Sequence, residues 1–338
     1  MKTIRRVLYP FSLLYAAITA IRNLFFSKNI FTSLSFSTPI IAVGNLSVGG
    51  TGKTPQIEYL IRLLSQQSLR LATISRGYKR KSKGMVVADA SHTAADLGDE
   101  PFQFYTKFPD VTVVASGDRI KAITYLLHQN NCPDVILLDD AMQHRKVKAG
   151  FYIMLTAYND FFYDDLVLPA GNLRESRFGA KRAHCIVVTK CPENLDETAK
   201  QKIRAKILRY APTTPIYFSK ITYSNSVYNN SQSILIKELK TNYILLAGIA
   251  KPEPFFNKLQ TGNILTLKYP DHHNFSAKDI DEIKQKAAGK RIITTEKDYM
   301  RLVNQLPAEQ LFYLPIQATF MFDEHVYFDE QILNFVGH

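Results

Sequence analysis

The chain has 338 residues, of which 46% are hydrophobic and 21% are charged, so it can bury a large core and is not a disordered protein. At roughly 150 residues per domain, this length predicts about two domains. Lys and Arg exceed Asp and Glu by 42 to 30, which gives a formal net charge of +12. The three cysteines form no C-x-x-C pair, and no apolar run reaches the ~20 residues of a spanning helix, which argues against a disulfide scaffold, a zinc cage and a polytopic membrane protein.

The first 38 residues are basic and apolar. They contain no Asp or Glu, and a mostly apolar run lies between Arg6 and Arg22. A signal peptide, a buried helical hairpin and a monotopic membrane anchor all fit this pattern, although Ala17–Ala20 is a poor cleavage site. We favour membrane-anchor helices over residues 1–38, because basic flanks beside a short apolar run suit an anionic membrane surface.

Short apolar runs then alternate with helical segments such as Gln56–Gln66 and Ile120–Gln129. The runs are rich in β-branched residues and do not alternate with polar ones, as expected of parallel strands covered on both faces. We therefore predict a doubly wound, mostly parallel α/β domain over residues 39–222. Its strands are expected at Pro39–Val43, Leu71–Ile74, Val111–Ala115, Val135–Leu138, Tyr152–Leu155 and Cys185–Val188.

The sequence GNLSVGGTGKTP, residues 44–55, follows the first of these runs and opens a helix. Glycines allow backbone N–H groups to surround phosphate oxygens at a helix N-terminus, and the motif's Lys and Thr reach the terminal phosphates and Mg²⁺. Ser47 stands where the general motif has Gly, but the strand–loop–helix context predicts a P-loop NTPase-like nucleotide site. Its binding residues are expected to be Gly49, Gly50, Thr51, Gly52, Lys53 and Thr54.

Two carboxylates, Asp139 and Asp140, follow the strand expected at Val135–Leu138. An acid at the end of a neighbouring strand is what a phosphate loop needs to hold magnesium, whereas a helix cap needs only one Asp. The segment after the Cys185–Val188 run reads TKCP, with Pro192 where a guanine-specific loop has Asp. The sequence therefore favours ATP over GTP, with Mg²⁺ as its metal.

Six basic residues lie between Arg70 and Lys83 with no intervening acid. They form either a solvated face or a collar for an anionic substrate or membrane surface, and no RNA- or DNA-binding motif accompanies them. Residues 223–233 are polar and rich in Asn and Ser, which marks a domain boundary. A smaller α/β domain is expected over 223–338, with strands at Tyr243–Ala247, Ile264–Leu267 and Arg291–Thr295 and a helix at Ser276–Ala288.

Three further clusters fall in expected loops, and each has a structural and a functional interpretation. Asp99 in GDEP suits a helix N-terminus. Arg174 and Glu175, in LPAGNLRE, are either surface residues or a phosphate contact and a metal ligand. His272 and His273, in PDHHNF, point in different directions as neighbours, and Asp271 is placed to orient one imidazole.

Seven motifs together resemble one family, the tetraacyldisaccharide 4'-kinases of lipid A synthesis. The resemblance runs from the N-terminus to about residue 302. The motifs occur in the order GNLSVGGTGKTP, SRGYKR (75–80), GDEP (98–101), LLDDAMQHR (137–145), LPAGNLRE (168–175), PDHHNF (270–275) and TTEKDYMRL (294–302).

This resemblance implies an ATP- and Mg²⁺-dependent transferase that phosphorylates the 4'-hydroxyl of a tetraacyl glucosamine disaccharide 1-phosphate. It implies Asp99 as the general base, assisted by His272, with Lys53 on the phosphates and with a domain 223–338 that closes over the site. Arg174 is then a phosphate contact, and Gln143 and His144 are substrate contacts. Magnesium is expected on Thr54, Asp139, Asp140 and Glu175, directly or through water.

The same resemblance places the enzyme at the cytoplasmic face of the inner membrane, with no nucleic acid and no obligate protein partner. Two other classes remain as alternatives. A P-loop ATPase that acts as a switch explains Lys53 and Asp139 but needs neither Asp99 nor His272. A basic membrane-binding protein without activity explains only the N-terminus and the charge.

Overall fold

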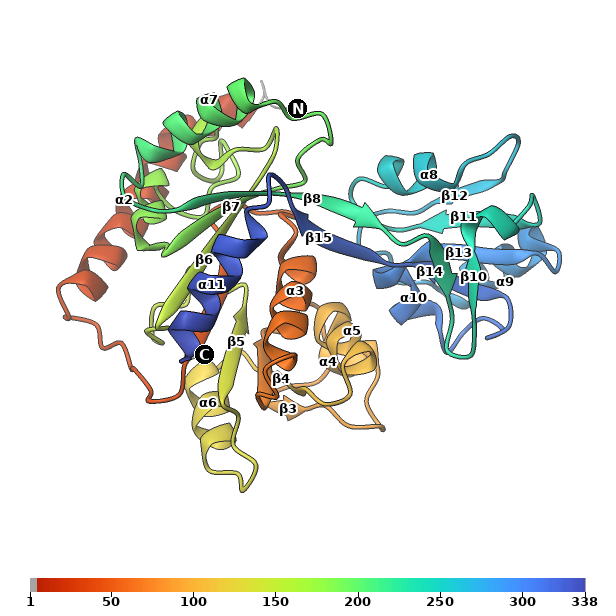
Figure 1. Ribbon diagram of the computed structural model, residues 1–338, viewed down its shortest axis with the longest axis horizontal. Coiled ribbons are helices and arrows are strands. Elements are labelled where there is room, and N and C mark those ends of the chain that lie inside the picture. The colour runs from red at the N-terminus through yellow and green to blue at the C-terminus, as the bar shows by residue number, and fades with distance from the viewer. Residues whose placement is uncertain (1–4, 338) are drawn as a thin grey trace. The chain divides into compact units, whose positions relative to one another are not determined.

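The computed structural model describes residues 5–337. The first four residues of the expected anchor, Lys2 among them, lie outside the described residues. The chain divides into two compact units. Unit 1 comprises Met1–Arg76, Asp110–Ile221 and Ala318–His338, and unit 2 comprises Gly77–Pro109 and Thr222–Gln317. Each unit is an α/β structure with its own sheet (Figure 1).

Unit 1 is built on parallel strands in the order β8-β7-β6-β1-β5-β2-β4. Crossover connections are required between parallel strands, and they pass through helices, as in other α/β folds. The strands are β1 (Ile40–Asn45), β2 (Leu71–Ser75), β4 (Thr112–Ala115), β5 (Val135–Asp139), β6 (Phe151–Ala157), β7 (Cys185–Thr189) and β8 (Ile216–Tyr223), with β15 (Ile316–Phe320) beside β8. The helices are α2 (Tyr9–Ser27), α3 (Lys53–Ser65), α6 (Arg119–Leu127), α7 (Glu197–Leu208) and α11 (His325–Val336), with 3₁₀ turns at Arg6–Leu8, Phe162–Asp164 and Arg177–Arg182.

Helices cover both faces of this sheet. Successive residues of a strand point to opposite faces, so the contacts of two neighbouring residues show what covers each face. Phe218 of β8 packs in one core cluster with Ile203 and Ile207 of α7. Tyr217, the preceding residue, contacts the ring of Phe328 in α11, with ring centroids 5.4 Å apart. Tyr59 of α3 contacts the same Phe328 ring, so α3 and α11 share the face opposite α7. The doubly wound prediction is confirmed.

Unit 2 has a mixed sheet in the order β10-β9-β14-β13-β11-β12, in which β9 and β10 are antiparallel and β14, β13, β11 and β12 are parallel. Its strands are β9 (Ser226–Tyr228), β10 (Ser233–Leu235), β11 (Tyr243–Ala247), β12 (Thr266–Lys268), β13 (Arg291–Thr295) and β14 (Leu311–Leu314), and the two-residue strand β3 (Val86–Val87) of segment Gly77–Pro109 is not part of this sheet. Its helices are α4 (Ala94–Leu97), α5 (Asp99–Lys107), α8 (Glu253–Leu259), α9 (Ala277–Ala287) and α10 (Glu296–Leu302), with a 3₁₀ turn at Ile236–Glu238.

Residues 223–233 are not an irregular linker. They contribute β9 and the first residue of β10, which form an antiparallel hairpin at the edge of the second sheet. Asn and Ser are common in turns, and this hairpin is short, so its polar turn residues hide the strand pattern. The start of unit 2 at Thr222 nevertheless lies next to the expected boundary.

The expected domain ranges 39–222 and 223–338 differ from the two units in two places. Gly77–Pro109, the segment that carries Asp99, belongs to unit 2, where α5 packs against α10. Ala318–His338 belongs to unit 1, where α11 covers the sheet. Each segment belongs to one unit but adjoins the other unit in sequence. The composition of the chain does not change where these segments begin, so it does not mark them.

Candidate active site

The segment predicted to bind phosphate is a tight loop between β1 and α3. Gly52 caps α3 with φ of +87° and Gly49 has φ of +114°, conformations that favour glycine. At Gly44 an added Cβ would lie 2.7 Å from the backbone nitrogen of Met142, so a side chain is excluded there. The N-terminus of α3, with no acidic residue in its first turn, therefore faces a glycine-rich loop, as in an anion-binding site.

Lys53, the first residue of α3, lies beside one carboxylate of the predicted acidic pair. Its Nζ is 3.5 Å from Asp140 Oδ1 and 3.4 Å from Asn45 Oδ1. Arg174 Nη1 donates to both carboxylate oxygens of Asp140, at 3.0 and 2.9 Å. Burial alone would raise the pKa of Asp140, but Lys53 and Arg174 outweigh it and lower that pKa, so the carboxylate is ionised at neutral pH.

Asp139 ends β5 and is buried, with its carboxylate Oδ2 accepting a hydrogen bond of 3.3 Å from Ser75 at the end of β2. The buried guanidinium of Arg119 donates to the backbone carbonyls of Asp139 and Asp140, at 2.5 and 3.1 Å. The ends of β1, β2 and β5 thus converge on the loop, which is where open α/β sheets bind ligands. Both predicted carboxylates lie there.

Glu175, predicted to hold magnesium directly or through water, is bound by side chains of the protein itself. Its Oε1 accepts from Gln143 Nε2 (2.9 Å) and Arg182 (2.7 Å), and its Oε2 accepts from Asn23 (2.6 Å) and Arg182 (2.9 Å). Four hydrogen bonds use most of the acceptor positions of one carboxylate. Glu175 therefore organises this region of unit 1, and only a water-mediated contact with a metal fits its geometry.

The remaining oxygen groups at the loop fit magnesium. Thr54, Asp139 and Asp140 offer a hydroxyl and carboxylates, the hard donors that Mg²⁺ prefers. Within residues 5–337, no group of three or more His, Cys, Asp and Glu side chains is arranged to hold a metal ion. Magnesium in nucleotide sites is usually bound by one or two carboxylates together with substrate phosphates and water.

Two residues that the sequence did not single out hold the loop from the end of β7. Thr189 Oγ1 donates to the carbonyl of Thr51 at 2.7 Å, and Lys190 Nζ donates to the carbonyl of Gly50 at 2.6 Å. Lys190 adopts a positive φ of 59°, which bends the chain back toward the loop. These bonds fix carbonyls on the side of the loop away from its N–H groups, so they favour the phosphate-binding conformation.

We expect Lys190→Ala to raise the Kd for ATP by roughly 3- to 10-fold, the effect of losing one charge-assisted but exposed hydrogen bond. The kcat at saturating ATP should change by less than about twofold, because Lys190 shapes the loop and is bonded to its backbone. Fluorescent-nucleotide titration and steady-state kinetics measure the two quantities. Lys202→Ala, an exposed lysine of α7, is the matched control; equal affinity in both variants would contradict the assignment.

The second group of predicted residues meets inside unit 2. Asp99 is the first residue of α5, after Gly98 at the cap position, and its carboxylate lies 3.2 Å from His272 Nδ1. Arg301 of α10 donates from Nε to Asp99 Oδ1 at 3.1 Å and from Nη2 to Asp99 Oδ2. Burial alone would raise the pKa of Asp99, but His272 and Arg301 hold it well below its usual range. Asp99 is therefore more than a helix cap.

The two neighbouring histidines have different partners, as the sequence predicts. His273 Nε2 is 3.1 Å from Asp279 Oδ2, and its ring packs against Tyr269 and Phe275. His272 is the one that reaches Asp99. Asp271 does not orient it closely, because Asp271 Oδ1 is 4.0 Å from His272 Nε2 and the side chain is about half exposed.

The basic segment 70–83 is divided between the two units. Arg70 pairs with Asp134 at 2.6 Å at the start of β2, the opposite end of the strand from Ser75 and the loop. Lys79, Arg80, Lys81 and Lys83 belong to unit 2, whereas Arg70 and Arg76 belong to unit 1. Arg70 is thus part of an exposed ion pair, which agrees with the interpretation of this residue as part of a solvated face.

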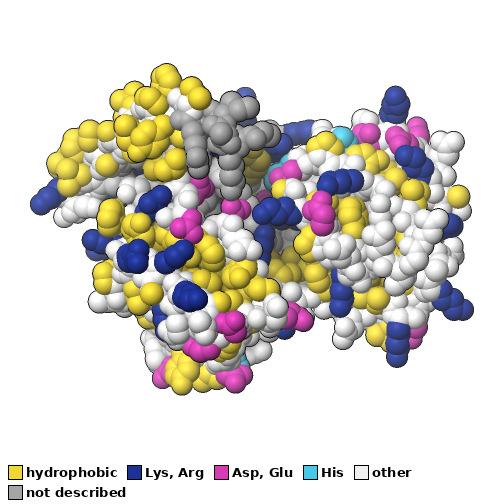
Figure 2. Space-filling model, turned by 90° about the horizontal axis from the view of Figure 1, so that it is seen from above, with side chains coloured by type: hydrophobic (Ala, Val, Ile, Leu, Met, Phe, Trp, Pro, Cys, Tyr) yellow, Lys and Arg dark blue, Asp and Glu magenta, His cyan; other side chains and the backbone are white. Residues whose placement is uncertain are grey.

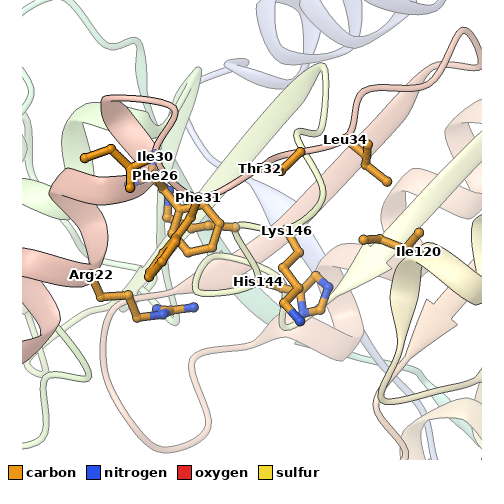
Figure 3. Close-up of a pocket in the computed structure, with 10 residues that line it drawn as sticks. Arg22, Phe26, Ile30, Phe31, Thr32, Leu34, Ile120, His144 and Lys146 are labelled. Carbon is orange, nitrogen blue, oxygen red and sulfur yellow. The ribbon is translucent and has the colours of Figure 1, made fainter.

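A pocket of about 680 Å³ opens beside the C-terminal end of α2 (Figure 3). Its apolar wall includes Phe26 and Phe31, whose rings meet edge to face with centroids 5.3 Å apart. Burial and the neighbouring Arg119 lower the pKa of His144, which also lines the pocket, to about 4. The pocket is therefore lined by both apolar and cationic side chains; the cationic ones are Arg22, Arg145 and Lys146.

Helix α2 exposes most of its apolar side chains and turns several polar ones toward the protein. Ser12 Oγ accepts a 2.9 Å bond from the backbone of Ala170, and Tyr15 and Asn23 bond to Arg174 and Glu175. The opposite stripe is apolar and more than half exposed; it comprises Phe11, Leu14, Ile18 and Ile21, and Val7 in the preceding 3₁₀ turn is exposed as well. Figure 2 shows hydrophobic side chains gathered over one end of unit 1. None of the helices in residues 5–337 has both the length and the apolar character to cross a bilayer.

Helix α2 also decides between two interpretations of the N-terminus. A buried helical hairpin predicts a second helix packed on the first and an apolar face turned inward. In the described residues of this segment a 3₁₀ turn leads into the single helix α2, and the apolar stripe faces outward. The buried hairpin is therefore wrong.

Comparison with known proteins places the chain in a family. The family model for Tetraacyldisaccharide-1-P 4'-kinase, LpxK, matches residues 4–336. The tetraacyldisaccharide 4'-kinase of Flavobacterium johnsoniae is 56% identical, over 99% of this chain and 98% of that protein. The same enzyme of Porphyromonas gingivalis is 40% identical, again over 99% and 98% of the two chains.

A solved structure agrees with these sequence relatives. LpxK from Aquifex aeolicus, crystallised in complex with ATP, is 29% identical, with a TM-score of 0.79 over 98% of this chain and 99% of that one. The similarity thus covers both units and the N-terminal helix. The chain belongs to the tetraacyldisaccharide-1-P 4'-kinase family.

Proposed function

We propose that this kinase transfers the γ-phosphoryl group of ATP to the 4'-hydroxyl of a tetraacyl glucosamine disaccharide 1-phosphate, in lipid A synthesis. Family membership supports the reaction, since the relatives carry this activity in their names. The observation that carries the mechanism is a division of labour between two clusters. Unit 1 holds a phosphate loop with a carboxylate pair, and unit 2 holds an ionised Asp99 beside His272.

The unit 1 cluster is suited to bind the nucleotide. Backbone N–H groups of Gly49, Gly50, Thr51 and Gly52 and the N-terminus of α3 would surround the phosphates, with Lys53 on the terminal ones. Lys53 now neutralises Asp140, so the arrival of phosphates would give its ammonium a second anionic partner. Bound Mg²⁺ would neutralise charge on the phosphates, held by Thr54, Asp139 and Asp140.

The unit 2 cluster is suited to receive the acceptor. A sugar hydroxyl is a weak nucleophile, and a carboxylate in hydrogen-bond reach can take its proton as the new P–O bond forms. Phosphoryl transfer passes through a loose transition state. The carboxylate that takes the proton therefore has to be ionised and well oriented, and it need not be a strong base. Asp99 would accept the proton at a carboxylate oxygen, with His272 orienting that carboxylate.

Transfer requires the nucleotide and the acceptor hydroxyl to come within near-attack distance, roughly 3–3.5 Å between the reacting atoms. Since the two clusters belong to different units, the substrates have to engage groups of both units in the transfer step. Excluding water at that moment would also protect ATP from hydrolysis.

Helix α2 supports a membrane-bound location. An acylated substrate stays in the bilayer, so the enzyme has to reach the surface. A helix that is held to the protein by its polar stripe and exposes Phe11, Leu14 and Ile18 is suited to lie in the headgroup region with its apolar side down. Because ATP is supplied in the cytoplasm, the cytoplasmic face of the inner membrane is the consistent site.

The pocket beside α2 would take part of the lipid substrate. Phe26, Phe31 and Leu34 offer an apolar wall for an acyl chain, and Arg22, Arg145 and Lys146 offer charge to a phosphate. The substrate carries both groups on one molecule. His144 lines this pocket, which agrees with its predicted substrate contact, whereas the Gln143 amide bonds to Asn45, Glu175 and Arg174.

The α2 surface gives a direct test of membrane attachment. We expect the triple variant Phe11→Ser, Leu14→Ser, Ile18→Ser to bind vesicles containing anionic lipid at least ~10-fold more weakly, because each buried apolar side chain contributes about 1.5–3 kcal/mol. Activity on a short-chain soluble substrate should persist. Deletion of residues 1–30 is a poorer test, since it also removes the partners of Ala170, Arg174 and Glu175. Unchanged sedimentation with vesicles would place the attachment elsewhere.

ATP turnover with and without the acylated disaccharide distinguishes the kinase from a switch ATPase. The kinase should consume ATP at an appreciable rate only when the acylated sugar is present, with one phospholipid product formed per ADP. A switch ATPase would hydrolyse ATP without it and leave the lipid unchanged, and that result would overturn the proposed function.

A further inference from the structure

Arg301 lies at the centre of the polar cluster in unit 2, and no role has yet been given to it. It comes from the TTEKDYMRL segment, residues 294–302, which forms the end of β13 and helix α10. Its guanidinium is nearly buried, with 11% of the side chain exposed. All three nitrogens of that guanidinium are engaged, two of them by Asp99.

The guanidinium is anchored from behind by a fully buried carboxylate. Arg301 Nη1 donates to Asp298 Oδ1 at 3.1 Å. Asp298 Oδ2 accepts from the backbone N–H of Gly248 at 2.9 Å and from Thr295 Oγ1 at 2.7 Å. The ends of β11 and β13 thus fix Asp298, and Asp298 fixes Arg301. This chain of bonds leaves Arg301 little freedom to turn away from Asp99.

On the side away from Asp298, the planar guanidinium of Arg301 donates two hydrogen bonds to the carboxylate of Asp99, like the two prongs of a fork. The Nε and Nη2 atoms face the two carboxylate oxygens, the bidentate geometry that distinguishes Arg from Lys. Arg301 Nη2 also lies 2.9 Å from His272 Nδ1. Both nitrogens approach Asp99 Oδ2, so the plane and rotation of the carboxylate are set by Arg301 and His272 together, and the imidazole cannot move without disturbing the fork.

We propose that Arg301 is a positioning residue for the acceptor's base: its guanidinium keeps the Asp99 carboxylate ionised and fixes the direction in which it faces the sugar hydroxyl. The inference rests on the proposed role of Asp99 as proton acceptor. It adds a third member to the Asp99–His272 pair and gives the TTEKDYMRL segment a function in the reaction.

The charge balance around Asp99 makes Arg301 the decisive cation. Lys297 of α10 is also nearby, but its Nζ already pairs with Glu100 at 2.6 Å. The other named groups around the cluster carry no permanent positive charge. They are His272 with the Tyr78 ring packed on it, Asp271, Glu100 and Asp298.

Loss of Arg301 removes one of the groups that lower the pKa of Asp99. Burial disfavours the carboxylate and raises its pKa, and the His272 bond and Arg301 oppose burial. If the guanidinium is removed, the pKa of Asp99 rises, and a protonated Asp99 cannot accept the hydroxyl proton. Activity that depends on ionised Asp99 is then lost as pH falls through the raised pKa, and it recovers as pH rises.

The test compares Arg301→Gln and Arg301→Lys with wild type in kcat/KM for the acylated disaccharide between pH 5.5 and 9, at saturating Mg-ATP. We expect the wild type to show no acid limb from Asp99 in this range. Arg301→Gln should have a lower kcat/KM and an acid limb at higher pH than the wild type, because loss of the guanidinium raises the pKa of Asp99 and frees its carboxylate to turn. Arg301→Lys should keep the wild-type pH profile with a lower kcat, since it keeps the charge and loses the fork.

A second readout does not depend on activity. The ¹³C shift of the Asp99 carboxyl, assigned with Asp99→Asn, reports its protonation directly, and its pKa should rise in Arg301→Gln and stay low in Arg301→Lys. Lys286→Gln, which removes an exposed charge of α9 in the same unit, is the matched control and should titrate as wild type. Melting temperature and ATP affinity, measured on every variant, separate positioning from loss of fold.

The outcomes separate this inference from the proposed function. An unchanged carboxyl titration and pH profile in a folded Arg301→Gln protein would overturn the role of Arg301 and leave Asp99 as the base. A raised Asp99 pKa in Arg301→Gln, together with full activity in Asp99→Ala, would instead confirm that Arg301 keeps the carboxylate ionised and overturn the assignment of Asp99 as the base.

Discussion

Asp99→Ala is expected to lower kcat by more than ~10²-fold while the affinity for ATP stays nearly unchanged. The variant removes the carboxylate that would take the proton of the sugar hydroxyl, and Asp99 lies in unit 2, whereas the phosphate loop lies in unit 1. It also leaves the buried Arg301 without its main partner, so stability should fall as well. Single-turnover transfer rates and nucleotide titration measure the two quantities.

Asp271→Asn is the matched control for this prediction. It removes a carboxylate from the same loop as His272, but one that is about half exposed and 4.0 Å from the imidazole. We expect it to retain most of the activity. Asp99→Asn keeps the shape of the side chain and should be as inactive as Asp99→Ala. Near-normal turnover in a folded Asp99→Asn protein would refute the assignment of the base.

Lys53→Met is the second substitution with a large expected effect. Methionine keeps much of the length of the side chain but loses the charge that would lie on the terminal phosphates, so kcat/KM for ATP should fall by at least ~10²-fold. The acidic pair also loses its Lys53 contact, and the pKa of Asp140 should rise, because Lys53 is one of the three cations that lower it, with Arg174 and Arg119.

Lys121→Met, at an exposed position near the start of α6 in the same unit, removes an equal charge and should behave as wild type. Mg-ATP titration by fluorescence and steady-state kinetics distinguish weaker binding from slower transfer. A Lys53→Met protein that transfers phosphate at the wild-type rate would show that the loop is not the nucleotide site.

Much of the predicted nucleotide site in unit 1 could be derived from the residues alone, because the motifs that indicate it are each continuous in sequence. A β-branched run, a glycine loop and a helix adjoin one another in residues 40–65, and Asp139 and Asp140 directly follow a strand. The strands β11 and β13 were predicted to the residue for the same reason. Parallel strands buried on both faces are continuous apolar runs that are hard to mistake.

What the sequence missed depends on contacts between distant segments. Arg301 is about 200 residues from Asp99, and it reads as one more basic residue in the last turn of a helix. Lys190 and Glu175 were similarly ambiguous, since only the fold shows that one bonds to the loop and the other to Arg182. The motif TTEKDYMRL, which resembles the family but had no predicted role, was the available signal for Arg301.

The outward orientation of the apolar stripe of α2 agrees with the favoured anchor, but the apolar spacing alone could not establish it. The apolar spacing of Phe11, Leu14 and Ile18 predicts an amphipathic helix equally well whether that stripe faces a core or a membrane. The partners of the opposite stripe decide the matter, and they are loop residues near 170–175 that lie some 150 positions away. Polar contacts to the protein leave the apolar stripe outside.

Transfer of labelled γ-phosphate from Mg-ATP to purified tetraacyl disaccharide 1-phosphate in detergent micelles tests the central claim most directly, with Lys53→Met and Asp99→Asn measured in parallel. The account predicts labelled lipid from the wild type, with the new phosphate on the 4'-oxygen by mass spectrometry, and little from either variant. Hydrolysis of ATP without labelled lipid would contradict it.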